Sequence, residues 1–381
     1  MHIVHAGASA TPNQVNGLNQ MVWTVARHQA RMGHRVDLIL TEPPSPDGMA
    51  AARDWGITLI QAPPLLKGGL SWWPPASADV LHAHSVFIPM QAFLCAAARR
   101  HGVPYVITPN GGVNPNILRR GALKKGVYSR LVEQPRFLAA AAITAVTPME
   151  EEEIRAFVPG FRGAVPCIHN PVDMTALTAA DADGDRMARG SAKPRLVYMG
   201  RFDIAHKGLD LLLDTARRLP ECELVLYGND AAALGGLSLP DNARLHSPVY
   251  GADKITALRG ADLYIQTSRW EAFGVSVAEA MALGVPCAIT ETMSLAPIFT
   301  SADLGLVLPF DAAGAAERLR HALGDPGTLE SWSARARHYA IRRFSPDAIA
   351  HDYLATYEAM LVGRNERQLG WSRAGSGTPL P

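Results

Sequence analysis

One stretch decides the fold class: S-R-W-E-A-F-G-V-S-V-A-E-A-M-A-L-G-V-P, which runs from Ser268 to Pro286. It places two carboxylates, Glu271 and Glu279, on either side of Phe273-Gly274. After that glycine, apolar residues recur at helical spacing until a glycine and a proline end the pattern. The stretch therefore predicts a helix that begins near Phe273-Gly274.

The spacing of the two carboxylates has a physical consequence. If most of the interval is helical, eight residues at about 1.5 Å rise place them roughly 12 Å apart. That length matches the span from a sugar ring, across a diphosphate, to a ribose. Free N–H groups at the helix start would lie between them, where a diphosphate finds donors and a positive dipole end. The alternative is that both glutamates are solvated or complement the helix dipole.

The whole pattern resembles a known family. E-A-F-G stands where retaining glycosyltransferases of the GT-B fold, in the large family four, usually have E-G-F-G, and E-A-M-A-x-G-x-P also matches. The resemblance to this E-x7-E type, which includes bacterial polysaccharide glycosyltransferases, implies an α/β protein. It implies two Rossmann-like domains facing each other across a cleft, and sugar transfer from a nucleoside-diphosphate sugar to an acceptor hydroxyl.

Length and composition agree with a globular two-domain protein. The chain has 381 residues, 48% of them hydrophobic and 19% charged, which is enough for two cores. A net charge of +1 gives no general attraction to nucleic acid. The four cysteines are scattered without metal-ligand spacing. The chain start lacks the features of a signal peptide, and no apolar run reaches the length of a membrane span. We expect a cytoplasmic protein, or one held peripherally at the inner face of the membrane.

Short apolar runs alternate with helical patterns, which predicts parallel sheets joined by crossover helices. The predicted strands are 1–6, 35–40, 79–82, 104–108, 196–199, 223–227, 262–266 and 286–290. A polar stretch of small residues near 179–193 is typical of a joint between domains. We expect an acceptor-side Rossmann-like domain at 1–173 and a donor-binding domain at 174–345. A C-terminal helix at 346–365 should pack back towards the first domain, and 366–381 should form a mobile tail.

The first half has its own features that resemble the family. Asn16-Gly17-Leu18 resembles the glycine loop that approaches donor phosphate and acceptor, although Gly17 is equally typical of an ordinary turn. The family commonly places a histidine close to the reacting sugar, in T-x-H-G or P-H-G. The matching residue here is Asn110 in T-P-N-G, which can donate and accept hydrogen bonds but cannot exchange a proton near neutral pH. The alternative is that Asn110 serves only turn geometry.

His82-Ala83-His84 ends a predicted strand and resembles the D-V-x-H-x-H of these enzymes. The two histidines alternate onto the same face of the strand. Because no third ligand is spaced nearby, we predict no metal site here.

The second half supplies two cations. Gly200-Arg201 follows an apolar strand, and Lys207-Gly208 opens a helix rich in leucine. This resembles the G-R-x-x-x-x-K-G element, in which the arginine and lysine hold the donor diphosphate. Two phosphates need fixed counter-charge, whereas either cation alone is usually solvated. Asp203 and His206, between them, remain unassigned.

The resemblance implies a role for each matched residue. Glu271 contacts hydroxyls of a hexose-type sugar, and Glu279 contacts the ribose hydroxyls. Arg201 and Lys207 bind the diphosphate, assisted by backbone N–H groups of Phe273, Gly274 and Val275. No residue stands out as a covalent nucleophile, so we expect front-face displacement, in which the leaving phosphate helps take the acceptor proton. The predicted catalytic residues are Glu271, Asn110, Arg201 and Lys207. No cofactor or metal is expected besides the donor.

Two rival functions remain open. The first is a non-catalytic nucleotide-sugar-binding module that kept the fold, which only Asn110 favours. The second is an NAD-dependent oxidoreductase, opposed by the lack of G-x-G-x-x-G after a strand. No Walker-type loop is present, and D-A-D-G-D at Asp181–Asp185 lies in the joint region without a twelfth-position glutamate.

A basic segment at 117–138 interleaves arginines and lysines with apolar residues. It could dock on anionic lipid headgroups, which would suit a lipid-linked rather than a free saccharide acceptor. It could equally be an ordinary surface helix with its charges facing outward.

Overall fold

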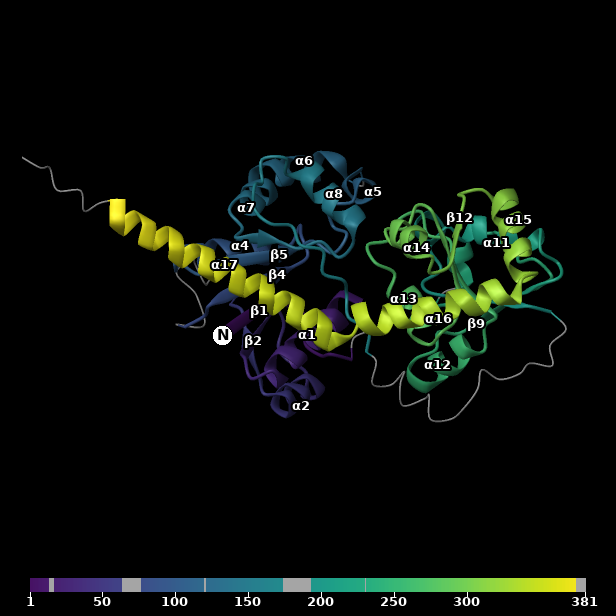
Figure 1. The fold of residues 1–381 in the computed structure, drawn as a ribbon, viewed down its shortest axis with the longest axis horizontal. Helices are drawn as coiled ribbons and strands as arrows, with labels where there is room; N and C mark the ends of the chain where they lie inside the picture. The colour runs from purple at the N-terminus through teal and green to yellow at the C-terminus, as the bar shows by residue number, and fades with distance from the viewer. Residues whose placement is uncertain (14–16, 64–76, 120, 174–192, 230, 375–381) are drawn as a thin grey trace, which may run out of the picture. The chain divides into compact units, whose positions relative to one another are not determined.

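The computed structural model describes the chain except for residues 14–16, 64–76, 120, 174–192, 230 and 375–381. It contains two compact units, each a sheet surrounded by helices (Figure 1). The first unit comprises Met1–Val146, Glu151–Ile168 and the chain from Asp347 onward. The second comprises Thr147–Glu150 and His169–Pro346. The division after Ile168 lies earlier in the chain than the expected boundary at 173.

The sheet of the first unit is parallel throughout its described strands, in the order β3-β2-β1-β4-β5-β6. The strands are β1 (His2–Ala8), β2 (Arg35–Leu40), β3 (Ile57–Gln61), β4 (Val80–His84), β5 (Tyr105–Thr108) and β6 (Ala142–Ile143). The helices are α1 (Gly17–Arg31), α2 (Pro46–Trp55), α4 (Pro89–Arg100), α5 (Pro115–Arg119), α6 (Ala122–Tyr128), a π-helical turn η1 (Ser129–Glu133), α7 (Gln134–Leu138) and α8 (Pro148–Phe157). Because helices cover both faces of a parallel sheet, its central strands are buried along nearly their whole length.

The long helix α17 (Pro346–Ala374) belongs to the first unit. Its buried residues Ile349, Tyr353 and Tyr357 join the core cluster formed by α1 and one face of the sheet, and Figure 1 shows the yellow helix running alongside α1. The helix continues past Glu366, where we had expected an aperiodic tail. That prediction was wrong as far as Ala374. The segment lacks an apolar stripe, but it also lacks a proline or glycine cluster to stop a helix that is already formed.

The second unit has a parallel sheet of order β12-β11-β10-β7-β8-β9 among its described strands. The strands are β7 (Arg195–Met199), β8 (Glu223–Tyr227), β9 (Ala243–His246), β10 (Leu263–Gln266), β11 (Cys287–Thr290) and β12 (Leu306–Leu308). The helical segments are α10 (Ile204–Lys207), α11 (Leu209–Arg217), η3 (Ala231–Leu234), α12 (Gly251–Arg259), α13 (Val275–Ala282), α14 (Ala296–Ala302), α15 (Ala312–Leu323) and α16 (Pro326–Arg343).

The two sheets share one topology, which confirms the predicted α/β class with two Rossmann-like units. In each, strand order reverses next to the first strand, between β1 and β4 and between β7 and β10. Ligands of such sheets bind outside the carboxyl ends of the strands at this switch point. The loops that follow β7 and β10 are therefore the first place to look for a site.

All eight predicted strands are present, whereas β3, β6, β9 and β12 were missed. These four are the edge strands of the two sheets. Asn16, the D-A-D-G-D run and the greater part of the predicted joint lie outside the described residues. In the part of the chain that the structure describes, no helix has the length and apolar character to cross a bilayer.

Candidate functional site at the switch point of the second sheet

Two loops meet at the carboxyl ends of β7 and β10. The loop after β7 carries Arg201 and leads into the short helix α10, while the loop after β10 carries Glu271. Gly208 joins α10 to α11 with φ +63°, and a Cβ there would lie 2.1 Å from the carbonyl oxygen of Thr267. The Thr267 hydroxyl donates to the Gly208 carbonyl at 3.1 Å. Only a glycine lets the two loops approach this closely.

This approach brings Lys207 and Glu271 together. Lys207 Nζ forms an ion pair with Glu271 Oε2, and both side chains are largely buried, at 14% and 16% exposure. Ser268 Oγ donates to the same oxygen at 3.3 Å, and His206 Nε2 lies 3.9 Å from it. Burial lowers the pKa of His206, with Glu271 acting in the opposite direction. Glu271, which we predicted to contact the sugar, is thus paired with Lys207, which we predicted to bind the diphosphate.

Arg269 holds both loops in place, a role that we did not predict. Its guanidinium forms two hydrogen bonds with Asp210 of α11, at 2.9 and 2.6 Å, and donates to the Ile204 carbonyl at 2.6 Å. Its backbone N–H donates to the carbonyl of His206 at 2.8 Å. The hydrogen bonds from Arg269 are the main cause of the lowered pKa of Asp210. Arg269 lies inside the quoted stretch, but no spacing in the sequence links it to Asp210.

The start of α13 lies next to Glu271 in the chain. Gly274 has φ +83°, and the helix begins at Val275 without a side-chain cap, so its first N–H groups have no intrahelical partner. Phe273 is buried against the rings of His169 and Phe344 and anchors the turn. Residues 271–274 are not helical whereas 275–279 are, so the helical rise behind the 12 Å estimate applies only to the second part of the interval. The predicted helix start itself is displaced by only one residue.

Glu279 and Arg201 lie in the same unit with separate partners. Glu279 Oε2 forms an ion pair with Lys254 Nζ of α12. This oxygen is buried, and it has no hydrogen-bond partner besides the Lys254 ammonium among the described residues. The Arg201 side chain is exposed, and its backbone carbonyl accepts from the Tyr198 hydroxyl at 2.9 Å.

The remaining predicted residues, Gly17 and Asn110, belong to the first unit. Gly17 is the exposed first residue of α1. Asn110 follows β5 with φ +52°, which is the left-handed region that asparagine tolerates better than most residues. Its Nδ2 donates to the Thr108 carbonyl at 3.4 Å, and its buried Oδ1 has no hydrogen-bond partner among the described residues. The backbone fits a turn former, while the amide oxygen is still able to accept a hydrogen bond.

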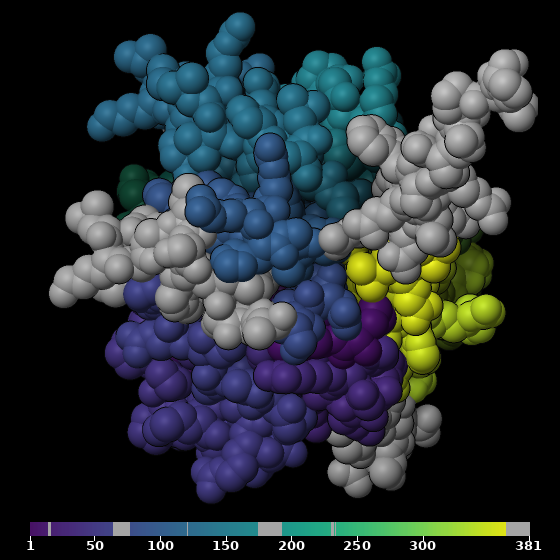
Figure 2. All heavy atoms as spheres, turned by 90° about the vertical axis from the view of Figure 1, so that its left-hand side faces the viewer, coloured from purple at the N-terminus to yellow at the C-terminus, as the bar shows by residue number. Residues whose placement is uncertain are grey.

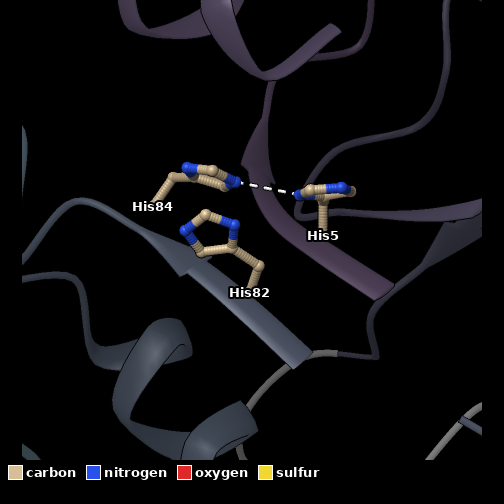
Figure 3. A group of neighbouring side chains, drawn as sticks. All are labelled: His5, His82 and His84. Carbon is tan, nitrogen blue, oxygen red and sulfur yellow. Dashed lines mark hydrogen bonds between the residues drawn. The ribbon is translucent and has the colours of Figure 1, made fainter. Parts of the chain in front are cut away.

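A third histidine, His5 of β1, lies beside His82 and His84 (Figure 3). Our expectation that no third ligand is nearby was therefore wrong: β1 and β4 are neighbours, although 79 residues separate His5 from His84. His5 Nδ1 and His84 Nε2 are 3.0 Å apart, and Gln29 Oε1 accepts from His5 Nε2 at 2.7 Å. His82 contacts the hydroxyls of Tyr357 and Thr108, at 2.6 and 2.7 Å.

Burial lowers the pKa of all three histidines, that of His5 to about 4. They are therefore neutral imidazoles near pH 7. Both ring nitrogens of His5 and of His82 already have partners, and only His84 Nδ1 has none among the described residues. The cluster is built as a buried hydrogen-bond network that joins α1, β1, β4, β5 and α17.

Sequence reasoning also missed a carboxyl group near the Asn110 loop. Glu153 of α8 accepts a hydrogen bond from Asn114 Nδ2 at 2.5 Å, and Asn114 ends the T-P-N-G-G-V-N segment. Burial raises the pKa of Glu153 to about 7, and the hydrogen bond from Asn114 opposes this only partly. No motif marks Glu153, because it stands in a run of four glutamates.

Comparison with known proteins agrees with this geometry. Residues 15–176 match the family model described as Glycosyltransferase Family 4, and residues 185–339 match that described as Glycosyl transferases group 1. The chain is 29% identical to a phosphatidyl-myo-inositol mannosyltransferase of Mycobacterium tuberculosis, over 51% of this chain and 53% of that protein. The chain thus spans about half the length of that relative.

Two further matches cover nearly the whole chain. A D-inositol 3-phosphate glycosyltransferase of Jonesia denitrificans is 27% identical, over 95% of this chain and 96% of that protein. The crystal structure of Anabaena HepE in complex with UDP-glucose superimposes with a TM-score of 0.69 at 16% identity, over 94% of this chain and all of that one. This likeness extends to the fold, which is GT-B as predicted. The chain belongs to the glycosyltransferase family described by the group 1 and family 4 models.

Proposed function

We propose that this protein is a retaining glycosyltransferase that moves a hexose-type sugar from a nucleoside-diphosphate sugar to an acceptor hydroxyl. The observation that carries the proposal is the Lys207–Glu271 pair at the switch point of the second sheet, beside the uncapped start of α13. A carboxylate for sugar hydroxyls, a cation for phosphate and free helix N–H groups then adjoin one another. The UDP-glucose complex of the Anabaena neighbour supports a nucleotide-sugar donor.

Each residue has one physical task in this proposal. Arg201 and Lys207 neutralise the diphosphate, the N–H groups near Phe273, Gly274 and Val275 assist them, and Glu279 binds the ribose. When the diphosphate binds Lys207, Glu271 becomes free to accept hydrogen bonds from hydroxyls of the sugar. Gly17 and Asn110 are assigned to the side that receives donor phosphate and acceptor.

The proposed chemistry is a front-face displacement. The acceptor oxygen bonds to the anomeric carbon on the face from which the diphosphate leaves, and a phosphate oxygen takes the acceptor proton. Positive charge from Arg201 and Lys207 stabilises the leaving group, so orientation and electrostatics provide most of the rate enhancement and no metal or further cofactor is required.

The acceptor is proposed from the names of the relatives, which include a phosphatidyl-myo-inositol mannosyltransferase and a D-inositol 3-phosphate glycosyltransferase. We propose a saccharide or lipid-linked acceptor in surface polysaccharide or glycolipid synthesis. A lipid-linked acceptor would place this cytoplasmic enzyme at the inner face of the membrane, in peripheral contact through residues 117–138.

A donor screen tests the proposal. The purified protein is incubated with UDP-, GDP- and ADP-sugars, with and without candidate acceptors, and nucleotide release is measured. We expect the sugars of one nucleotide to release that nucleotide slowly without acceptor and faster with it. Retention of the anomeric configuration is read from the anomeric NMR signals of the product. Binding of a nucleotide sugar without any turnover would instead identify a binding module. Thermal stabilisation by NAD alone would favour the oxidoreductase reading.

A further inference from the structure

His206 of α10 is fixed in place beside the proposed donor site. Its backbone N–H donates to Asp203 Oδ1 at 2.9 Å, and its carbonyl accepts from the Arg269 N–H at 2.8 Å. Its ring stacks on the indole of Trp270, with the ring centroids 4.7 Å apart and the planes 15° from parallel. Because the side chain is only 16% exposed, the ring is held between the two loops and not turned into solvent.

The imidazole faces the same carboxylate oxygen that pairs with Lys207. His206 Nε2 lies 3.9 Å from Glu271 Oε2, which is beyond hydrogen-bond length but within reach of a small side-chain rotation. Lys207 Nζ and Ser268 Oγ already contact this oxygen. Lys207 therefore supplies the counter-charge of Glu271, and His206 is a second basic group within reach of the same oxygen.

The charge of His206 depends on its neighbours. Burial is the main reason why its pKa is lowered, so the ring is mostly neutral at about pH 7. Glu271 favours protonation of the ring, and Lys207 opposes it. Asp203 and Arg201 act in the same two directions more weakly. Moving a cation away, or adding negative charge, will therefore shift the ring towards the imidazolium.

Donor binding makes both changes in the proposed function, on which this inference rests. The diphosphate binds Lys207 and brings negative charge to α10, so Glu271 loses its counter-charge in a largely buried position. A buried carboxylate without a partner is unfavourable. Protonated His206 can replace the lost cation. Its stack on Trp270 favours the charged ring, because the face of an indole attracts cations.

We propose that His206 is a positioning residue for Glu271, which takes up one proton from solvent when a nucleoside-diphosphate sugar draws Lys207 away. The proton adds to the imidazole, and the imidazolium donates a hydrogen bond to Glu271 Oε2. Glu271 is then kept ionised and directed at the hydroxyls of the sugar. When the diphosphate leaves, Lys207 returns to Glu271 and His206 releases the proton. Donor binding and protonation of His206 therefore strengthen each other.

Calorimetry of donor binding tests the proposal. The full-length protein is titrated, without acceptor, with the nucleotide sugar that binds it, because the esterified phosphates of such a donor carry no proton that titrates near neutral pH. Titrations in buffers of different ionisation enthalpy count the protons taken up. We expect uptake of up to one proton per donor. Because the bound state holds the proton more tightly, affinity should rise as pH falls, by at most about tenfold per pH unit.

Three sets of variants separate the parts of this mechanism. His206→Asn should abolish the proton uptake and the pH dependence, because asparagine donates a hydrogen bond but does not titrate. Glu271→Gln should remove most of the uptake although His206 is present, because a neutral amide needs no counter-charge. Trp270→Phe should keep most of the uptake and Trp270→Leu should lower it, since only phenylalanine preserves an aromatic face.

Two exposed histidines provide matched controls, one in each unit. His338 lies on α16. His101 follows the last residue of α4, in the blue part of the chain that Figure 2 shows at the surface of the first unit. His338→Asn and His101→Asn should bind the donor with the affinity and the proton uptake of the parent.

Three outcomes would overturn the proposal. The first is parent-like proton uptake in His206→Asn. The second is an affinity loss in His206→Asn by the same factor at every pH, because the ring would then be only a structural contact. The third is undiminished uptake in Glu271→Gln, because the proton would then respond to the phosphates directly. In all three the donor still binds, so the proposed sugar transfer stands. If no nucleotide sugar bound at all, the proposed function would fail together with this inference.

Discussion

Lys207 and Glu271, 64 residues apart in the chain, form a largely buried ion pair at the carboxyl ends of β7 and β10. The pair makes the two proposed ligand contacts interdependent, because a diphosphate must compete with Glu271 for Lys207. Removing one member leaves the other charge without its partner. For a buried pair this costs more than replacing both members by apolar residues.

The variants Lys207→Ala and Glu271→Gln should therefore change affinity for free nucleoside diphosphate in opposite directions. Lys207→Ala removes a charge-assisted contact worth about 1.5–3 kcal/mol and should weaken binding at least tenfold. Glu271→Gln releases Lys207 and should strengthen binding about fivefold, while turnover falls severely. Calorimetry with the diphosphate and the nucleoside measures both changes. Two losses of equal size would mean that the pair acts only as a structural link.

Glu279→Ala should weaken nucleoside and nucleoside diphosphate alike, by about tenfold, because a ribose contact is common to both ligands. Lys254→Ala is the matched control, since it removes the ion-pair partner but leaves the carboxylate in place. Its nucleoside affinity should be unchanged or higher. If Lys254→Ala lost as much affinity as Glu279→Ala, Glu279 would be a structural residue of α13 and α12.

Asn110 can be tested with three substitutions that separate its backbone from its side chain. Asn110→Gly keeps the left-handed turn and removes the amide, whereas Asn110→Ala also strains the turn by about 1 kcal/mol. If the amide contacts sugar or acceptor, both variants should lose turnover without a change in the pH profile. Asn110→His should add an ionisation near pH 6–7 that the parent lacks. Full activity of Asn110→Gly would reduce Asn110 to a turn former.

Glu153 should make the free energy of unfolding depend on pH. Its native pKa of about 7 exceeds the ordinary value of 4.5, so the native state binds the proton more tightly and stability falls as pH rises between these values. Glu153→Gln should stabilise the protein at pH 8 by about 1 kcal/mol, once solvent screening of this partly exposed group is counted, and hardly at pH 4.5. Denaturant titration at both pH values measures this. The exposed Glu152→Gln should show no such difference, and a Glu153→Gln gain of equal size at both pH values would contradict the assignment.

The histidine cluster should have the opposite pH dependence. The unfolded chain protonates His5 near pH 6.5, but the native state does so only near pH 4, so stability is lost as pH falls through that window. The slope approaches about 1.4 kcal/mol per pH unit for each such histidine. His5→Asn should make the slope of unfolding free energy between pH 7 and 5 shallower, whatever it does to absolute stability. The exposed His338→Asn is the control and should keep the parent slope.

How well the sequence predicts a strand depends on whether that strand lies at the centre or at the edge of its sheet. The eight predicted strands are central ones, whose residues are buried and mostly apolar because helices cover both sides of each sheet. The edge strands β3, β9 and β12 are partly exposed, and β6 has only two residues, so each gives a weaker strand pattern in the sequence. The E-x7-E stretch, Gly200-Arg201 and Lys207-Gly208 were found by their resemblance to family motifs. Such motifs can be read from sequence because each lies within a few residues of a strand end, where glycine allows the turn.

By itself, the sequence determined the fold class, the family and which loops of the second unit carry charge. Only the tertiary structure decided the partners: Lys207 with Glu271, Arg269 with Asp210, Glu153 with Asn114, and His5 with His84. The physical reason is that periodicity and motif spacing report on local geometry, which is set within a few residues of the chain. Contacts between loops at the end of a parallel sheet depend instead on strand order, and strand order is settled by how whole helices and strands pack.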